Sequence, residues 1–132
     1  MKKVALFLII SLFFSGLTIE TGLSINDFTF TNTRSLKIAL KGSMSVPNIK
    51  SNAQPVEVYQ NPQNLDVGFL ANLGMINITI FNAQNSPVYQ TSANGAANSH
   101  VYISTRNMSA GWYIIYISNM QGEFLQGSFM LQ

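Results

Sequence analysis

The segment GWYIIYIS, residues 111–118, carries the strongest fold signal in this 132-residue chain. It alternates two sets of large side chains, of which the first is Tyr113, Ile115 and Ile117 and the second is Trp112, Ile114 and Tyr116. Successive side chains of a β-strand point to opposite faces of the sheet. The pattern therefore predicts a strand with one set in a hydrophobic core and the other set facing outward.

The residues that lead into this strand look like a tyrosine corner. In VYISTRNMSAGWYIIYI, residues 101–117, Met108 stands three positions before Gly111, and Tyr113 stands two positions after it. In such a corner an apolar residue closes the end of the core and a glycine permits the tight backbone. The tyrosine hydroxyl bonds back to the backbone upstream. Met108, Gly111 and Tyr113 are therefore expected to have a structural role.

The rest of the chain predicts further short strands. Seven segments alternate apolar and polar residues, and they lie at 35–41, 56–60, 65–70, 75–81, 87–91, 100–104 and 124–131. Segments rich in Asn, Gly, Pro and Ser separate them, and the longest of these predicted loops is 43–55. Seven or eight strands at this spacing predict an all-β protein, an antiparallel sandwich or barrel.

The N-terminus has the form of a secretion signal. Lys2 and Lys3 precede an apolar run at residues 4–14, which is too short to span a bilayer comfortably. Small residues nearby suit cleavage after Ser24 or after Thr18. A buried N-terminal helix or an uncleaved anchor is the alternative.

These features divide the chain into three parts. Residues 1–24 are predicted to be a signal peptide, residues 25–34 a flexible lead, and residues 35–132 the β-sandwich domain. The signal predicts an extracytoplasmic location, which means the periplasm, the cell surface or the medium. After removal of the signal no membrane association is expected.

Charge and cysteine content exclude several classes of function. Only 9% of the residues are charged, against about 25% in ordinary globular chains. After Ser24 five basic residues stand against four acidic ones, so the net charge is only +1. Nucleic-acid binding needs clustered positive charge and is not expected. Without cysteine the domain has no disulfide, so its core must stabilise it.

Three further stretches of the sequence, outside the predicted tyrosine corner, match the pattern of a known domain family. IALKGS (38–43), NITIFNAQNSPVYQ (77–90) and GEFLQGSFML (122–131) occur in that order. Together with the corner they resemble the small secreted domains of Bacteroidales known as domain of unknown function 3244. The likeness covers Ser35–Gln132. It implies an immunoglobulin-like or fibronectin III-like β-sandwich outside the cytoplasm, and it supplies no catalytic residues.

The same region is also similar to the C-terminal sorting domains of type IX secretion cargo. Such a domain follows a large cargo domain, whereas almost nothing precedes it here. The chain also ends in FMLQ, residues 129–132, without the basic residue that often closes a sorting domain. A secretion or sorting role therefore ranks below a stand-alone module.

The sequence contains no recognisable set of catalytic residues, so an enzyme is not expected. His100 is the one histidine, and alternation with Val101 places it away from the core. A Ser-His-Asp triad would need Asp27 or Asp66 close to it in space, and nothing in the spacing arranges that. No nucleophile elbow, phosphate loop or zinc-ligand spacing occurs. No catalytic residue, metal or cofactor is assigned.

The outward side chains of the central strand predict a binding surface. In the immunoglobulin-like arrangement, strand 111–118 pairs with 75–81 and with 124–131. Their outward positions bring together five apolar residues, Trp112, Ile114, Tyr116, Phe81 and Met130. A contiguous apolar patch usually marks an interaction site. We expect this face to bind a protein partner or a second copy of the chain.

Three alternatives compete for the same face. Trp112 and Tyr116 could serve as stacking planes for a carbohydrate. The N-terminal segment or a long loop could cover the face. A register error of one residue would move every side chain to the opposite side of the sheet.

Overall fold

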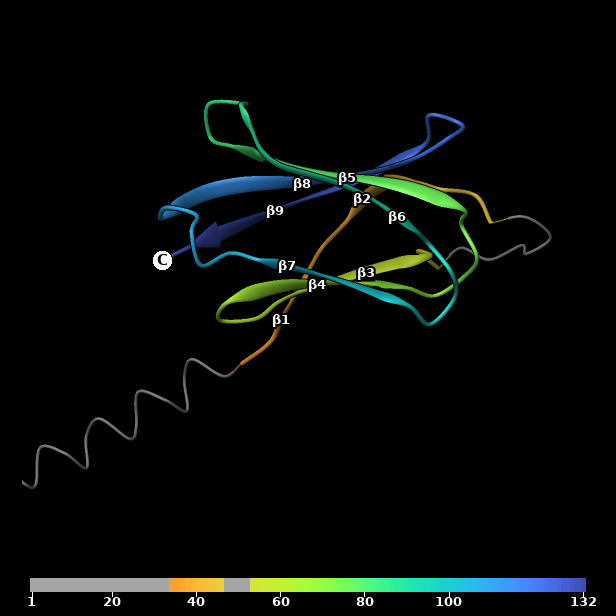
Figure 1. Cartoon of the computed structure of the whole chain (residues 1–132), viewed down its shortest axis with the longest axis horizontal. Helices are drawn as coiled ribbons and strands as arrows, with labels where there is room; N and C mark the ends of the chain where they lie inside the picture. The colour runs from red at the N-terminus through yellow and green to blue at the C-terminus, as the bar shows by residue number, and fades with distance from the viewer. Residues whose placement is uncertain (1–33, 47–52) are drawn as a thin grey trace, which may run out of the picture. The chain divides into compact units, whose positions relative to one another are not determined.

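The computed structural model describes residues 34–46 and 53–132 (Figure 1). Within them Ser35–Gln132 form one compact unit. The predicted signal peptide, the predicted lead up to residue 33 and residues 47–52 of the predicted loop lie outside the described residues. No helix in the described ranges could cross a lipid bilayer.

The described residues form nine β-strands in two antiparallel sheets. The first sheet has the order β1-β3-β4-β7 and the second has the order β2-β9-β8-β5-β6. Figure 1 shows them as two stacked layers, which confirms the predicted antiparallel β-sandwich. The strands are β1 (Leu36–Ile38), β2 (Lys41–Ser43), β3 (Val56–Gln60), β4 (Asn64–Phe69), β5 (Met75–Asn82), β6 (Pro87–Asn94), β7 (His100–Ser104), β8 (Gly111–Asn119) and β9 (Phe124–Leu131).

The first predicted strand, residues 35–41, is in fact two strands in different sheets. Ile38 of β1 pairs with Val58 of β3, whereas Lys41 of β2 pairs with Gln126 of β9. The chain crosses between the sheets over the two residues that separate β1 from β2. This split produces nine strands where seven or eight were predicted.

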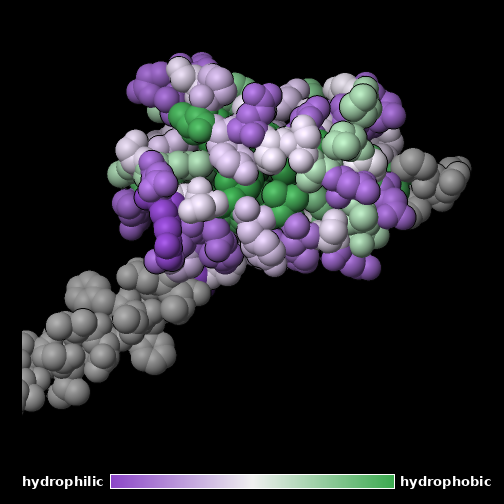
Figure 2. Space-filling model, viewed as in Figure 1, coloured by the Kyte–Doolittle hydropathy of each residue, from purple (hydrophilic) through white to green (hydrophobic). Residues whose placement is uncertain are grey.

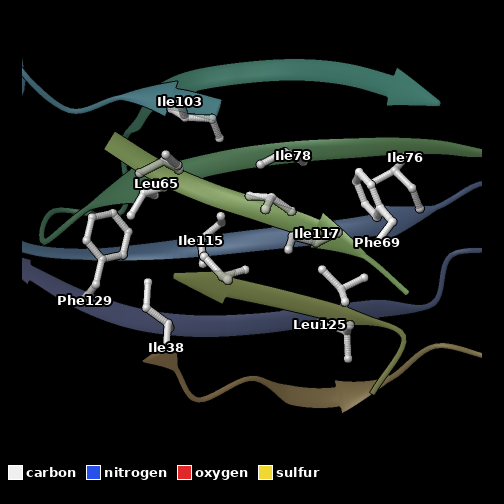
Figure 3. Packing of buried hydrophobic residues seen from close by; sticks show 14 of the residues in the cluster. Ile38, Leu65, Phe69, Ile76, Ile78, Ile103, Ile115, Ile117, Leu125 and Phe129 are labelled. Atoms are coloured by element: carbon white, nitrogen blue, oxygen red, sulfur yellow. The ribbon is translucent and has the colours of Figure 1, made fainter. Parts of the chain in front are cut away.

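The core lies between the two layers and takes side chains from both. Strand β8 contributes Tyr113, Ile115 and Ile117, all buried, while Trp112 and Ile114 are exposed, as alternation predicted. Figure 3 shows aliphatic side chains of β4, β5, β8 and β9 meeting between the sheets. Figure 2 shows apolar residues in the middle of its view, between the layers, with hydrophilic residues around them.

The residues before β8 have the geometry of a tyrosine corner. The Tyr113 hydroxyl donates a hydrogen bond of 2.6 Å to the backbone carbonyl of Ser109, four residues upstream. The Tyr113 ring is stacked on Phe129 of β9, with ring centroids 5.6 Å apart. Gly111 has a φ of 145°, which L side chains rarely adopt. Met108 is half-buried and packs against the core.

We expect Tyr113→Phe to lower the free energy of unfolding by about 1 kcal/mol. The ring would keep its packing on Phe129, and only the contacts of the hydroxyl with the carbonyl and the side-chain hydroxyl of Ser109 would be lost. Denaturant unfolding of both proteins measures the difference. Tyr102→Phe is the matched control, because Tyr102 is exposed and should leave the midpoint unchanged. Equal losses in the two variants would contradict a role for the corner.

Glu123, in the turn between β8 and β9, forms hydrogen bonds to the segment that follows β2. Its carboxylate accepts hydrogen bonds from the Ser45 hydroxyl at 2.7 Å and from Asn119 Nδ2 at 2.9 Å. These hydrogen bonds, those of Ser45 first, hold the pKa of Glu123 below its usual range. The contact fixes the start of β9 and therefore the position of Phe124.

Candidate functional site: the outer face of the five-stranded sheet

Strand β8 lies in the middle of the five-stranded sheet, between β5 and β9 as predicted. The register places Trp112 opposite Met130 of β9. Two residues further along β8, Ile114 is opposite Phe81 of β5. All five residues of the predicted surface, including Tyr116, therefore lie on one face, the face turned away from the core.

We call this surface the apolar outer face and define it by six residues: Trp112, Ile114, Tyr116, Phe81, Phe124 and Met130. Trp112 is 57% exposed, Met130 42% and Ile114 36%. Tyr116 and Phe81 are only half-buried. Large apolar side chains this exposed, side by side on the central strands of a sheet, form a contiguous patch rather than isolated exposed residues.

Three aromatic rings of the apolar outer face pack on one another. The Tyr116 ring is stacked on Phe124 with centroids 5.0 Å apart and an interplanar angle of 22°. Phe81 approaches the same ring edge-on, with centroids 6.5 Å apart. Aromatic pairs prefer these offset and T-shaped arrangements. Tyr116 is thereby fixed between two neighbours, whereas Trp112 stands at one end of the patch beside Met130.

Phe124 was not among the five predicted binding residues. Alternation along β9 already places it on the same face as Met130, six residues away, or about 20 Å along a strand. The antiparallel register places Phe124 opposite Ser118, two residues beyond Tyr116 on β8. Combining alternation with this register would have found it.

The apolar outer face is also nearly free of charge. The strands of the five-stranded sheet contain one charged residue, Lys41 of β2. Lys41 pairs with Gln126 of β9 at the edge of the sheet. Thr79 and Ser128, which lie opposite Tyr116 and Ile114 in the neighbouring strands, are polar and neutral. A partner would therefore not have to desolvate an ionised group in the middle of this surface.

The outer face of the four-stranded sheet carries the charges instead. Lys37 Nζ lies 3.1 Å from Glu57 Oε1, and the Tyr59 hydroxyl lies 3.4 Å from the other oxygen of the same carboxylate. The hydrogen bond and the charge of Glu57 raise the pKa of Lys37 above its usual value. The two outer faces of the sandwich therefore differ sharply, one charged and one apolar.

The structure brings Asp66 next to His100, a proximity that nothing in the sequence spacing indicated. His100 Nδ1 lies 2.7 Å from Asp66 Oδ1. Strands β4 and β7 are paired, with Gly68 opposite His100 and Asp66 opposite Tyr102, so His100 and Asp66 are diagonal neighbours on one face. Gly68 leaves room for the imidazole, which also stacks on Tyr102.

The described residues do not complete this pair to a Ser-His-Asp triad. Among residues 34–46 and 53–132, no serine or threonine hydroxyl hydrogen-bonds to the ring of His100. The same described residues contain no group of three or more His, Cys, Asp or Glu side chains that could hold a metal ion.

Comparison with known proteins identifies the fold and the family. None of the curated proteins matches the chain. A crystal structure of a DUF3244 family protein from Bacteroides vulgatus ATCC 8482, at 1.70 Å resolution, has an immunoglobulin-like β-sandwich fold. It superposes with a TM-score of 0.62 at 20% sequence identity and covers 75% of this chain and all of that one. The family model described as domain of unknown function (DUF3244) matches residues 37–131, and the chain therefore belongs to this family.

Proposed function

We propose that this chain is a secreted, non-catalytic immunoglobulin-like module that binds a protein partner through the apolar outer face. The observation that carries the proposal is the exposure of Trp112, Ile114 and Met130 side by side on a sheet face whose strands hold a single charged residue. In a monomeric soluble protein such a patch is the usual mark of an interaction surface.

The chemistry of the face suits an apolar and largely uncharged partner. Trp and Tyr dominate the energetics of many interfaces because they bury a large area and lose few rotamers on binding. Tyr116 is already held by Phe81 and Phe124, so its side chain would lose little further conformational freedom on binding. The strand backbone that carries these side chains is paired on both sides, which makes the surface rigid.

The location of this activity rests on the N-terminus. Residues 1–24 have the charge and apolar run of a secretion signal, and we propose that the domain acts in the periplasm, at the cell surface or outside the cell. The chain has few charged residues and many Ser, Thr, Asn and Gln residues, which fits that location.

Trp112→Ala and Tyr116→Ala should each weaken partner capture by about tenfold or more, as loss of a hot-spot residue does. The measurement is quantitative capture from envelope extracts, with the mature wild-type chain and each variant as bait. Tyr102→Ala is the matched control, an exposed tyrosine on the opposite sheet, and it should capture as wild type does. Near-native unfolding midpoints would show that the variants fold.

Two results would contradict the proposal. If both variants capture the same proteins as wild type, the apolar outer face is not the binding surface. If purified glycans change the fluorescence of Trp112, the only tryptophan, and compete with capture, the face binds carbohydrate instead of protein.

A further inference from the structure

Strand β6 forms a long free edge of the five-stranded sheet. It pairs with β5 on one side, and no described strand pairs with its other side. It has eight residues, whereas the other edge strands, β1, β2 and β7, have three, three and five. In an antiparallel ladder every second residue of such a strand turns its N–H and C=O away from its partner. An edge of this kind is a ready template for another strand.

Three devices that usually protect an edge, namely charged side chains, proline and β-bulges, are missing from most of β6. Its sequence, PVYQTSAN, contains no lysine and no other charged residue. Pro87 occupies only the first position, and the irregularity in the ladder lies beside it, between Ile80 and Phe81 of β5. The seven residues from Val88 to Asn94 therefore present a regular, uncharged edge.

We propose that β6 pairs antiparallel with β6 of a second copy of this chain, which joins the two five-stranded sheets into one continuous sheet. Antiparallel pairing of a strand with itself follows a two-fold axis, so both copies use the same residues. Such a contact fails when like charges meet across the axis, and β6 has none. This interface uses the edge of the sheet and is separate from the surface of the proposed function.

The pairing has a consequence for the apolar outer face. A two-fold axis between antiparallel strands stands perpendicular to the sheet, so the outer faces of both copies point to the same side. Val88, which is 44% exposed, would then lie near the junction. A dimer would present two copies of Trp112 in one direction and would bind a repetitive or dimeric partner with increased avidity.

The dimer should be weak. Edge pairing of one strand buries less than the area of a standard stable interface. A dissociation constant of roughly 10 μM to 1 mM is therefore expected for the wild-type chain. Sedimentation equilibrium of the mature chain across that concentration range is the appropriate measurement.

Charge variants of β6 test the pairing without dependence on its exact register. Gln90 and Ser92 are exposed and alternate on the outer side of β6, so Gln90→Lys with Ser92→Lys places lysines near their symmetry copies. We expect dimerisation to weaken about tenfold or more in this variant and in the matching double glutamate variant. An equimolar mixture of the two should restore association, most strongly at low salt.

Control variants distinguish dimerisation through the β6 edge from association through the apolar outer face. Gln126→Lys with Ser128→Lys adds the same charge to β9 on the same side of the sheet, and it should dimerise as wild type does. The single variant Gln90→Lys keeps the hydrogen bond between Ser92 and Asn77, so it covers the case in which the double variant fails to fold. Trp112→Ala should dimerise normally even if it loses its partner.

Three outcomes would overturn self-pairing. The wild-type chain could remain monomeric at about 1 mM, the upper limit expected here. The lysine variant could associate as strongly as wild type. The lysine and glutamate variants could both lose association without mutual rescue, which would mean that β6 meets a different strand.

Discussion

Replacing Ile115 by alanine is expected to lower the free energy of unfolding by about 3 to 4 kcal/mol, whereas Ile114→Ala should cost about 1 kcal/mol or less. The two isoleucines are neighbours in the same strand and differ in the face they occupy. Ile115 is completely buried, while Ile114 is 36% exposed on the apolar outer face. Truncation at residue 115 removes apolar contacts and leaves a cavity between the sheets.

The pair of variants is informative because both replace an isoleucine by alanine in the middle of β8. The change in β-propensity is therefore the same in both, and only the face differs. Urea unfolding with equal m-values gives the two free-energy differences, and the Ile115 variant should also melt more than about 10 °C below wild type. Ile114→Ala should in turn weaken partner capture while leaving the fold intact. Similar losses of unfolding free energy in both variants would show that β8 does not turn Ile115 into the core and Ile114 outward, as its alternation predicts.

Alternation in the sequence predicted most of the strands because this sandwich buries one face of each sheet. The predicted bounds of β3, β7 and β9 agree with the structure to the residue. Strand β6 extends three residues further than predicted, since Ser92, Ala93 and Asn94 continue the ladder with β5. These small and polar residues resemble a loop in sequence, and pairing with β5 keeps them extended.

The sequence did not predict the change of sheet between β1 and β2. A period of two continues through residues 36, 38 and 40, so the pattern describes one strand. In the structure Ile38 is buried, Leu40 is half-buried against the core and Leu36 is exposed at the edge. Which sheet a segment joins depends on partners far away in the chain, and local alternation contains no information about them.

The approach of Asp66 to His100 was missed for the same reason. The two residues are 34 positions apart, and only the pairing of β4 with β7 brings them together. By contrast, the apolar outer face was predictable, since it needs only the alternation of β8 and the neighbours that an immunoglobulin-like order gives it. Local alternation therefore predicts which side of a sheet a side chain occupies, but it does not predict which distant segments pair with each other.

Gly127→Ala should lower the free energy of unfolding by about 3 kcal/mol, the upper end of what overpacking costs. Gly127 lies on the inner side of β9, where the chain crosses from β1 to β2. A Cβ atom there would lie 2.7 Å from the Ala39 carbonyl oxygen and 2.7 Å from Ile38 Cγ2, with Leu40 Cδ2 at 3.0 Å. Because the closest atoms include backbone, a side-chain rotation cannot relieve the contact.

Gly68→Ala is the matched control, a glycine inside β4 whose added Cβ would approach the exposed imidazole of His100 at 3.2 Å, while the backbone oxygen of Glu57 would lie at an ordinary contact distance of 3.9 Å. That ring can move outward, and the less flexible unfolded chain would offset the loss, so the change should stay within about 1 kcal/mol. Thermal and urea unfolding of both variants measure the difference. If Gly127→Ala were as stable as wild type, the crossing segment could not rest on Gly127 as the structure shows. The expected result would instead support direct packing of the crossing segment on Gly127 of β9.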